Sequence, residues 1–399
     1  MLLSSVIKTN RVMAKHIIII TLLVTAKCFG QFNNGFNTQE VVSSIAACNT
    51  FNFDRQFGEH QDILPAGFAL NYDSGVMAMD NKFRVFDNGV YGIISFRGST
   101  DKIISWVENC YAAMIPAKGS MTVKEKLYEY TFSKTDSAAV HSGYALTVIM
   151  LSENIIAQVR RLNQKGIHHI IITGHSQGGA LATLTRAYLE HLPKHTFSKA
   201  TTFKTYAFAA PMSGNHEFAN NYNRLFKDSS FLVVNPEDPI PELPINYNED
   251  DKLLHKETIA SWIFGEAEFD VKNFGKHILV KLFEDGLKNH IKHSNSLINK
   301  FVDFRFGQVE MPEFIDDINY YPTGKIMEID SFEFPQVEVD VSNMTVGDRE
   351  KFTEVEGKYY YKEKSFFQHK PYGYYVHVLK KWDTMAYDKL ENKFLLTDL

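Results

Sequence analysis

Cysteine is scarce in this chain, which has 3 cysteines among 399 residues. Three thiols are too few for a disulfide framework in a chain of this length, so a packed core must hold the fold together. Cys28 lies in an N-terminal segment that we expect to be removed, which leaves Cys48 and Cys110. The sequence leaves open whether these two thiols pair.

Basic residues are fewer than acidic ones. The chain has 42 Lys and Arg and 47 Asp and Glu, which gives a formal net charge of -5. A nucleic-acid binder neutralises phosphates with clustered Lys and Arg, so we expect no nucleic-acid partner. After residue 30 the sequence shows neither low-complexity tracts nor a repeat of fixed period. This pattern predicts a compact folded body.

The apolar run near the N-terminus is too short for a stable membrane span. It reads IIIITLLVTA at residues 17–26, about half of the roughly 20 residues that a spanning helix needs. Basic residues precede this run and small residues follow it. We therefore predict a signal peptide over residues 1–30, cleavage near Gly30, and a secreted protein in an extracellular or periplasmic location.

Short β-rich runs alternate with helical stretches between about residues 76 and 240. The runs are mostly apolar, as expected for parallel strands that are covered on both faces, and residues 143–164 predict a helix between the first two. We predict an α/β fold with a central, mostly parallel sheet flanked by helices. The predicted strands are residues 90–96, 167–173, 203–209 and 231–235.

The C-terminal part has a different character. Residues 250–302 have a helical pattern, and the residues from there to about 353 are aromatic and β-branched runs broken by proline and glycine. We predict that residues 250–353 are a helical and β-hairpin insertion in one domain, whose core is formed by residues 76–245 and about 354–399. The last helix is predicted to begin near Pro371, because proline is favoured in a first helical turn.

A serine between two glycines follows the predicted strand at residues 167–173. In GHSQGGA, the glycines Gly174 and Gly178 allow a tight strand-to-helix turn that projects Ser176 out of the sheet. The helix that begins at Gln177 points its N-terminal amides toward any charge that forms there. This pattern, a nucleophile elbow, predicts Ser176 as a nucleophile.

A serine hydroxyl becomes nucleophilic when a histidine held by a carboxylate takes its proton. Asp238 lies just after the predicted strand at residues 231–235, in a turn stiffened by Pro239, and is the favoured acid. Glu237 and Glu242 are the competing carboxylates. In α/β-hydrolases the chain order is serine, acid, histidine, so the base should follow the acid.

Five segments carry a resemblance to a known family. They are SFRGSTD at 95–101, VHSGY at 140–144, GHSQGGA at 174–180, FAAPMSGNHEF at 208–218 and NPEDPIPELP at 235–244. Their order and spacing resemble the class 3 lipase family, the fungal triacylglycerol lipase-like branch of the α/β-hydrolases. The resemblance implies Ser176 as nucleophile, Asp238 as acid, and an oxyanion hole formed by the backbone amides of Ser99 and Gln177. It also implies that His141 is a structural residue near the site.

The chain departs from the family pattern where the catalytic histidine is expected, because the stretch YYPTGKIMEI has none. Of the histidines after Asp238, His369 precedes the predicted last helix and is our predicted base, with His377 as the rival. Four others lie in the predicted helical block and are read as solvated. His290 and His293 lack the further ligands of a metal site, so no metal or other cofactor is predicted.

The residues after the oxyanion loop allow two interpretations. Glu108 and Asn109 lie off the apolar stripe, whose members are Ile103, Val107, Tyr111 and Met114. The stripe is typical of an ordinary amphipathic helix packed on the core. It is equally typical of a lid, which in lipases of this family covers the site at this place.

The combined pattern predicts a secreted serine hydrolase that cleaves carboxylic esters through an acyl-enzyme. Its expected partner is a lipid, such as an acylglycerol or phospholipid, or another ester, met in solution or at a lipid interface. The alternatives are a hydrolase-fold binding or signalling module without turnover, and an esterase of non-lipid substrates.

Overall fold

The computed structural model describes residues 34–53, 63–244, 302–303, 306–317, 319–363 and 366–398. The chain divides into two units, residues 1–35 and residues 36–399, and nearly all described residues belong to the second. The predicted signal peptide and nearly all of the predicted helical block at 250–302 lie outside the described residues. No helix in the described ranges is long and apolar enough to cross a bilayer.

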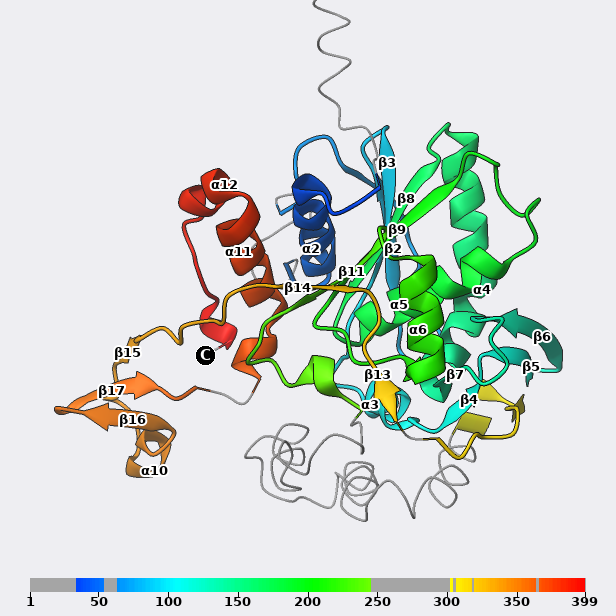
Figure 1. Ribbon diagram of the computed structural model, residues 1–399. Coiled ribbons are helices and arrows are strands. Elements are labelled where there is room, and N and C mark those ends of the chain that lie inside the picture. Colours follow the sequence, from blue (N-terminus) through cyan, green and yellow to red (C-terminus); the bar gives the residue numbers. More distant parts are fainter. Residues whose placement is uncertain are drawn as a thin grey trace, which may run out of the picture. The chain divides into compact units, whose positions relative to one another are not determined.

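Among the described residues, a seven-stranded sheet forms the centre of the second unit (Figure 1). Its first three strands pair antiparallel, and the strands from the third to the last pair parallel. In spatial order they are β1 (Ala69–Asp73), β2 (Phe83–Asp87), β3 (Tyr91–Phe96), β8 (His169–His175), β9 (Thr202–Phe208), β11 (Ser230–Val234) and β14 (Lys325–Glu328).

The four strands predicted from the sequence are β3, β8, β9 and β11, with small differences at their ends. Each is buried along most of its length. Strands covered on both faces bury every side chain, which is why each appears in the sequence as a continuous apolar run rather than an alternating one. The prediction of a mostly parallel central sheet is confirmed.

Helices cover both faces of this sheet (Figure 1). On one side lie α4 (Ser142–Gln164), α5 (Gln177–His191) and α6 (His216–Leu225), and on the other lie α2 (Thr38–Phe53) and α11 (Pro371–Trp382). The main core cluster joins apolar residues of α4 and α5 to those of β3 and β8. The predicted helices at 143–164 and at Pro371 are confirmed as α4 and α11.

The order of these elements is that of the α/β-hydrolase fold, as predicted. A helix connects each of the parallel pairs β8–β9 and β9–β11, and the sheet begins with antiparallel strands. The carboxyl end of β8 leads directly into α5, so the GHSQGGA turn lies at the edge of the sheet where the carboxyl ends of the parallel strands meet. Ligands bind at this edge in α/β proteins.

Smaller elements surround the main sheet. One sheet contains β13 (Tyr320–Tyr321), β10 (Gly214–Asn215), β7 (Ala139–His141) and β4 (Met114–Pro116), and another contains β12 (Val309–Glu310), β5 (Lys118–Val123) and β6 (Lys126–Thr131). A third contains β15 (Glu338–Val339), β17 (Lys358–Tyr361) and β16 (Phe352–Val355). The remaining helices are α3 (Ile103–Cys110), α10 (Val346–Arg349), α12 (Thr384–Lys389), η2 (Ile240–Glu242), η4 (Phe367–His369) and η5 (Leu396–Asp398).

The predicted insertion at 250–353 differs from the structure at one strand. β14 lies inside that range, yet it pairs parallel with β11 and extends the central sheet. Its four residues, KIME, are mostly exposed and two of them are charged, so the sequence contains no apolar run that would mark a sheet strand. The other boundaries of the insertion stay a prediction.

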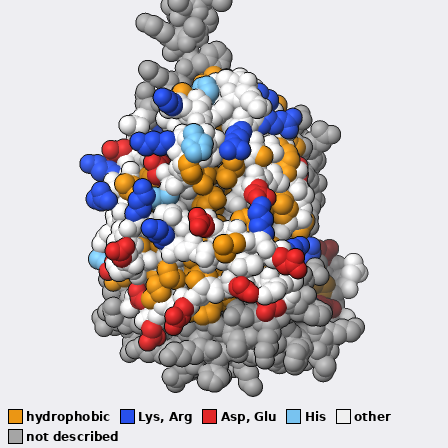
Figure 2. All heavy atoms as spheres, turned by 90° about the vertical axis from the view of Figure 1, so that its right-hand side faces the viewer, with side chains coloured by type: hydrophobic (Ala, Val, Ile, Leu, Met, Phe, Trp, Pro, Cys, Tyr) orange, Lys and Arg blue, Asp and Glu red, His pale blue; other side chains and the backbone are white. Residues whose placement is uncertain are grey.

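Figure 2 shows the side of the molecule that carries α4. Basic side chains are more frequent in the upper half of this view and acidic side chains in the lower half, with apolar areas between them. This face therefore carries charged side chains of both signs, although the formal net charge of the chain is -5.

A buried ion pair joins α2 to the sheet. Lys204 Nζ lies 2.7 Å from Glu40 Oε2, and the Tyr206 hydroxyl donates to the same oxygen at 2.8 Å. Both charged side chains are almost completely buried, at 1% and 5% exposure. Burial raises the pKa of Glu40, and the hydrogen bond and positive charge of Lys204 oppose that shift.

We predict that Lys204→Met lowers the free energy of unfolding by about 3–5 kcal/mol, because it leaves the Glu40 carboxyl buried without its cation. The double variant Lys204→Met/Glu40→Gln should recover part of this loss. Denaturant unfolding followed by circular dichroism measures both. Equal destabilisation by the single and the double variant would contradict this role for the pair.

Candidate active site

Ser176 lies in a strained turn between β8 and α5. Its φ is 59°, an unusual value for a residue other than glycine. A Cβ atom on Gly174 would come within 2.1 Å of the backbone of Gly178, and one on Gly178 within 2.4 Å of the Phe96 carbonyl oxygen. The turn therefore requires glycine on both sides of Ser176, as the sequence motif predicts.

A chain of hydrogen bonds connects Ser176, His369 and Asp238. His369 Nε2 lies 2.8 Å from Ser176 Oγ, and His369 Nδ1 lies 2.8 Å from Asp238 Oδ2. A carboxylate only accepts hydrogen bonds, so Nδ1 carries the proton and Nε2 is free to accept one from the serine hydroxyl. The structure thus brings the predicted nucleophile, base and acid together.

Asp238 is buried, whereas the competing carboxylates Glu237 and Glu242 are exposed. Its Oδ1 accepts a hydrogen bond from the Ile240 backbone amide at 3.0 Å. Its Oδ2 accepts a second bond, from the Tyr374 hydroxyl at 2.7 Å, besides the bond from the histidine. These bonds hold the carboxylate in the orientation that faces the imidazole.

The turn that carries His369 is fastened to the turn that carries the acid. Gln368, one residue before the histidine, accepts a hydrogen bond from Asn235 Nδ2 at 2.8 Å through its Oε1. The Gln368 side chain also forms two bonds with the Phe332 backbone, at 2.9 and 3.0 Å. In turn, the Asn235 backbone amide donates to the Tyr374 hydroxyl at 2.9 Å.

The rival base, His377, has a different environment. It lies within α11, and its ring packs against Phe332 with centroids 4.4 Å apart. Burial lowers its pKa to about 4, and its Nδ1 has no hydrogen-bond partner among the described residues. The structure thus brings His369, and not His377, to Ser176.

A second imidazole lies beside the first. The ring of His175 is 4.8 Å from that of His369 and 5.2 Å from that of Tyr374. Burial, together with the positive charge that His369 can carry, keeps the pKa of His175 well below its usual range. His175 therefore stays neutral and does not compete with His369 for a proton.

The oxyanion loop approaches the elbow closely at Gly98. A Cβ atom on Gly98 would lie 2.9 Å from the His175 carbonyl oxygen. The Ser99 hydroxyl donates to Gln177 Oε1 at 2.9 Å, which joins the loop to the first residue of α5. Within the described residues, neither the Ser99 nor the Gln177 backbone amide donates a hydrogen bond, so both are available to a ligand.

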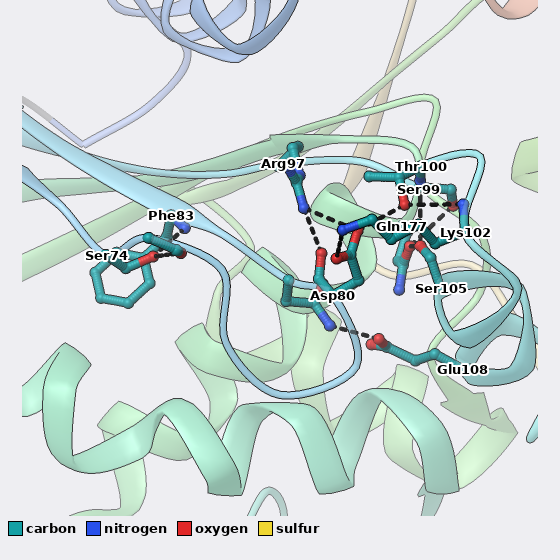
Figure 3. Close-up of polar contacts among 12 residues, drawn as sticks. Ser74, Asp80, Phe83, Arg97, Ser99, Thr100, Lys102, Ser105, Glu108 and Gln177 are labelled. Carbon is teal, nitrogen blue, oxygen red and sulfur yellow. Dashed lines mark hydrogen bonds and ion pairs between the residues drawn. The ribbon is translucent and has the colours of Figure 1, made fainter. Parts of the chain in front are cut away.

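A buried carboxylate organises the loop on either side of Ser99 (Figure 3). Asp80 accepts hydrogen bonds from Thr100 Oγ1 at 2.7 Å and Lys102 Nζ at 2.7 Å, and forms an ion pair with Arg97 at 3.2 Å. Burial alone would raise the pKa of Asp80, but these partners bring it below its ordinary value. The sequence analysis did not find this residue, because no motif marks it.

The helix after the oxyanion loop packs on the core. α3 ends at Cys110, before Tyr111, and Val107 and Tyr111 join the main core cluster. Glu108 lies off the apolar stripe, yet its side chain is completely buried and accepts a hydrogen bond from Asn81. This packing supports the interpretation of α3 as a core-packed helix, while the side chain of Ile103 lies outside the described part of the chain.

His141 caps α4 and does not reach the reacting groups. Its Nδ1 accepts a hydrogen bond from the Tyr144 backbone amide at 3.4 Å, and its ring stacks on that of Tyr144 at 3.8 Å. Burial lowers its pKa to about 3, so it is neutral.

Cys48 and Cys110, whose pairing the sequence does not decide, are both free thiols. Cys48 lies beside the hydroxyls of Thr173 and Ser95, and burial raises its pKa to about 12. Within the described ranges, no group of three or more His, Cys, Asp or Glu side chains could hold a metal ion. His290 and His293 lie outside the described residues.

Comparison with known proteins shows a match to one protein family. The class 3 lipase family matches residues 93–248, a segment that contains Ser99, Ser176 and Asp238. Over this segment the chain resembles the class 3 lipase family. The predicted resemblance is thereby confirmed, while the matched segment ends before His369.

Two of the curated relatives are fungal proteins. A secreted mono- and diacylglycerol lipase 1 of Fusarium solani is 28% identical over 137 residues, which cover 33% of this chain and 39% of the relative. A secreted mono- and diacylglycerol lipase LIP4 of Malassezia restricta is 22% identical over 223 residues, which cover 53% of this chain and 68% of the relative. The chain thus spans between about two fifths and two thirds of these relatives.

Solved structures include a triacylglyceride lipase of Rhizomucor miehei. It is 20% identical, the match covers 52% of this chain and 72% of that chain, and the TM-score is 0.37. At this level of similarity the role of each residue has to be argued from the geometry of the present site.

We predict that Gly178→Ala lowers the free energy of unfolding by about 1–3 kcal/mol or more, because the new methyl group meets fixed backbone atoms of β3. Gly347→Ala in α10 is the matched control, since a Cβ atom there meets nothing within 4 Å. Denaturant unfolding of the two variants measures the difference. A Gly178→Ala protein as stable as the control would contradict the requirement for glycine in the elbow.

Proposed function

We propose that the protein is a secreted serine hydrolase of carboxylic esters that uses Ser176, His369 and Asp238 as its triad. The observation that carries the proposal is the pair of 2.8 Å contacts that connect the serine oxygen to the imidazole and the imidazole to the carboxylate. The match of residues 93–248 to the class 3 lipase family supports the same reaction. Two relatives are named as secreted lipases, which supports export of this protein.

The geometry suggests the following sequence of steps. His369 Nε2 takes the Ser176 proton as Oγ attacks the acyl carbon, and Asp238 stabilises the imidazolium that forms. The amides of Ser99 and Gln177 donate to the tetrahedral oxyanion, and each such donor stabilises the transition state by about 3–4 kcal/mol. The imidazolium then protonates the leaving alcohol, and water, activated by the same histidine, releases the acid from the acyl-enzyme.

The proposed substrates are acylglycerols or phospholipids. The relatives are named mono- and diacylglycerol lipases, which supports partial glycerides as the first substrates to test. Esters without a lipid chain are the competing substrate class. No metal or organic cofactor takes part in the proposed steps.

We predict that His369→Ala lowers kcat/KM for a p-nitrophenyl ester by at least about 10²–10⁴-fold, the contribution expected of a general base. His377→Ala is the control and should keep a value close to that of the wild type. A protein that loses activity with His377→Ala and keeps it with His369→Ala would contradict the proposed base.

We predict that hydrolysis of p-nitrophenyl esters is faster with medium and long acyl chains than with acetate. Emulsified mono-, di- and triacylglycerols of one fatty acid, titrated for released acid, test the lipid substrates directly. The Ser176→Ala variant supplies the background rate. A clear preference for acetyl esters, with no release of acid from the glycerides, would overturn the lipase assignment in favour of a non-lipid esterase.

A further inference from the structure

A completely buried carboxyl group lies beneath the proposed oxyanion hole. Glu108 of α3 is 0% exposed, and its Oε2 accepts a hydrogen bond from Asn81 Nδ2 at 2.5 Å. Asn81 is itself buried and lies 3.4 Å from the Thr147 hydroxyl of α4. The mechanism proposed above assigns no role to this carboxyl group, and burying one is costly unless its oxygens have donors.

The side chain of Gln177 lies between this carboxyl group and the oxyanion loop (Figure 3). Its Oε1 accepts hydrogen bonds from the Ser99 hydroxyl at 2.9 Å and the Ser105 hydroxyl at 3.0 Å. Its Nε2 points toward the Glu108 carboxyl group. Both Gln177 Nε2 and Glu108 Oε1 are buried, and neither has a hydrogen-bond partner among the described residues.

We propose that Glu108 is a positioning residue for the oxyanion hole, which acts by fixing the orientation of the Gln177 carboxamide. This role rests on the proposed function. Through Gln177, the carboxyl group fixes Ser99 against the elbow, and thereby the two backbone amides that receive the oxyanion.

The hydrogen-bond roles in the network explain why the orientation matters. Asn109 Nδ2 donates to Ser99 Oγ at 2.9 Å, and the Thr100 amide donates to Ser105 Oγ at 3.2 Å. Each hydroxyl therefore already accepts a bond and needs an acceptor for its own proton. Gln177 Oε1 is that acceptor for both hydroxyls, but only while Nε2 faces the other way.

Without an acceptor at position 108, the carboxamide can turn over and present Nε2 to the two hydroxyls. Their protons would then lack the Gln177 acceptor, and the contact that holds the loop to α5 would loosen. Oxyanion-hole donors act in the transition state and only weakly on bound substrate. Loss of the carboxyl group should therefore lower kcat and leave KM almost unchanged.

Burial favours the neutral form of the Glu108 carboxyl group. Burial raises the pKa of Glu108 to about 8, although the hydrogen bond from Asn81 opposes the shift. A neutral glutamine at position 108 keeps one oxygen as an acceptor and has nearly the same shape. Glu108→Gln is therefore the conservative variant, and Glu108→Leu removes both oxygens at similar volume.

The test is a double-mutant cycle on the full chain, with p-nitrophenyl butyrate as substrate. We expect Glu108→Leu to lower kcat by about 10–100-fold with KM within about twofold of the wild type, and Glu108→Gln to restore most of kcat. In a Gln177→Leu background, Glu108→Leu should have little further effect, because the residue through which it acts is gone.

Glu40→Gln is the matched control for loss of a buried carboxyl group elsewhere in the fold, and it should leave kcat unchanged even where it lowers stability. A folded Glu108→Leu protein with the kcat of the wild type would overturn the role of Glu108 alone. So would an equal decrease in kcat when Glu108→Leu is introduced into the wild type and into the Gln177→Leu variant. A wild-type chain with no Ser176-dependent hydrolysis would overturn the proposed function, and this role with it.

Discussion

The hydrogen bonds from Ser176 to His369 and from His369 to Asp238 are the constraint on which the rest of the site depends. His369 is 193 positions from the serine and 131 positions from the acid along the chain. Local structure cannot fix such a contact, so the turns themselves must be fastened. Gln368, Asn235 and Tyr374 do this, because hydrogen bonds from Asn235 to Gln368 and Tyr374, and from Tyr374 to Asp238, join the turn of the acid to the segment that carries the histidine.

The sequence was sufficient to predict the parts of the fold that depend on local patterns. The doubly covered strands appear as apolar runs, and the elbow needs glycine at two fixed positions, so β8, α5 and Ser176 could be found without a structure. Asp238 could be favoured because a proline turn follows a strand. α2 and β14 were not predicted, since α2 lies before the recognised motifs and β14 has no apolar run.

The remaining features depend on packing between distant segments. His369 and His377 lie in the same aromatic stretch, and what separates them is which ring meets the elbow and which packs on Phe332. Glu108 lies off the apolar stripe of its helix, but the packing of α3 turns its side chain toward Asn81. A carboxyl group buried beneath the proposed site gives no sequence signal by itself, because its neighbours Asn81 and Gln177 come from distant parts of the chain.

The reactivity of the site depends on Ser176 acting as a nucleophile that His369 activates. Covalent labelling of the folded protein with a fluorophosphonate, followed by mass spectrometry of the peptides, tests this claim most directly. The account predicts one adduct, on the peptide that contains Ser176, and its loss in His369→Ala. A folded wild-type protein that stays unlabelled, or carries its adduct on another residue, would contradict the account.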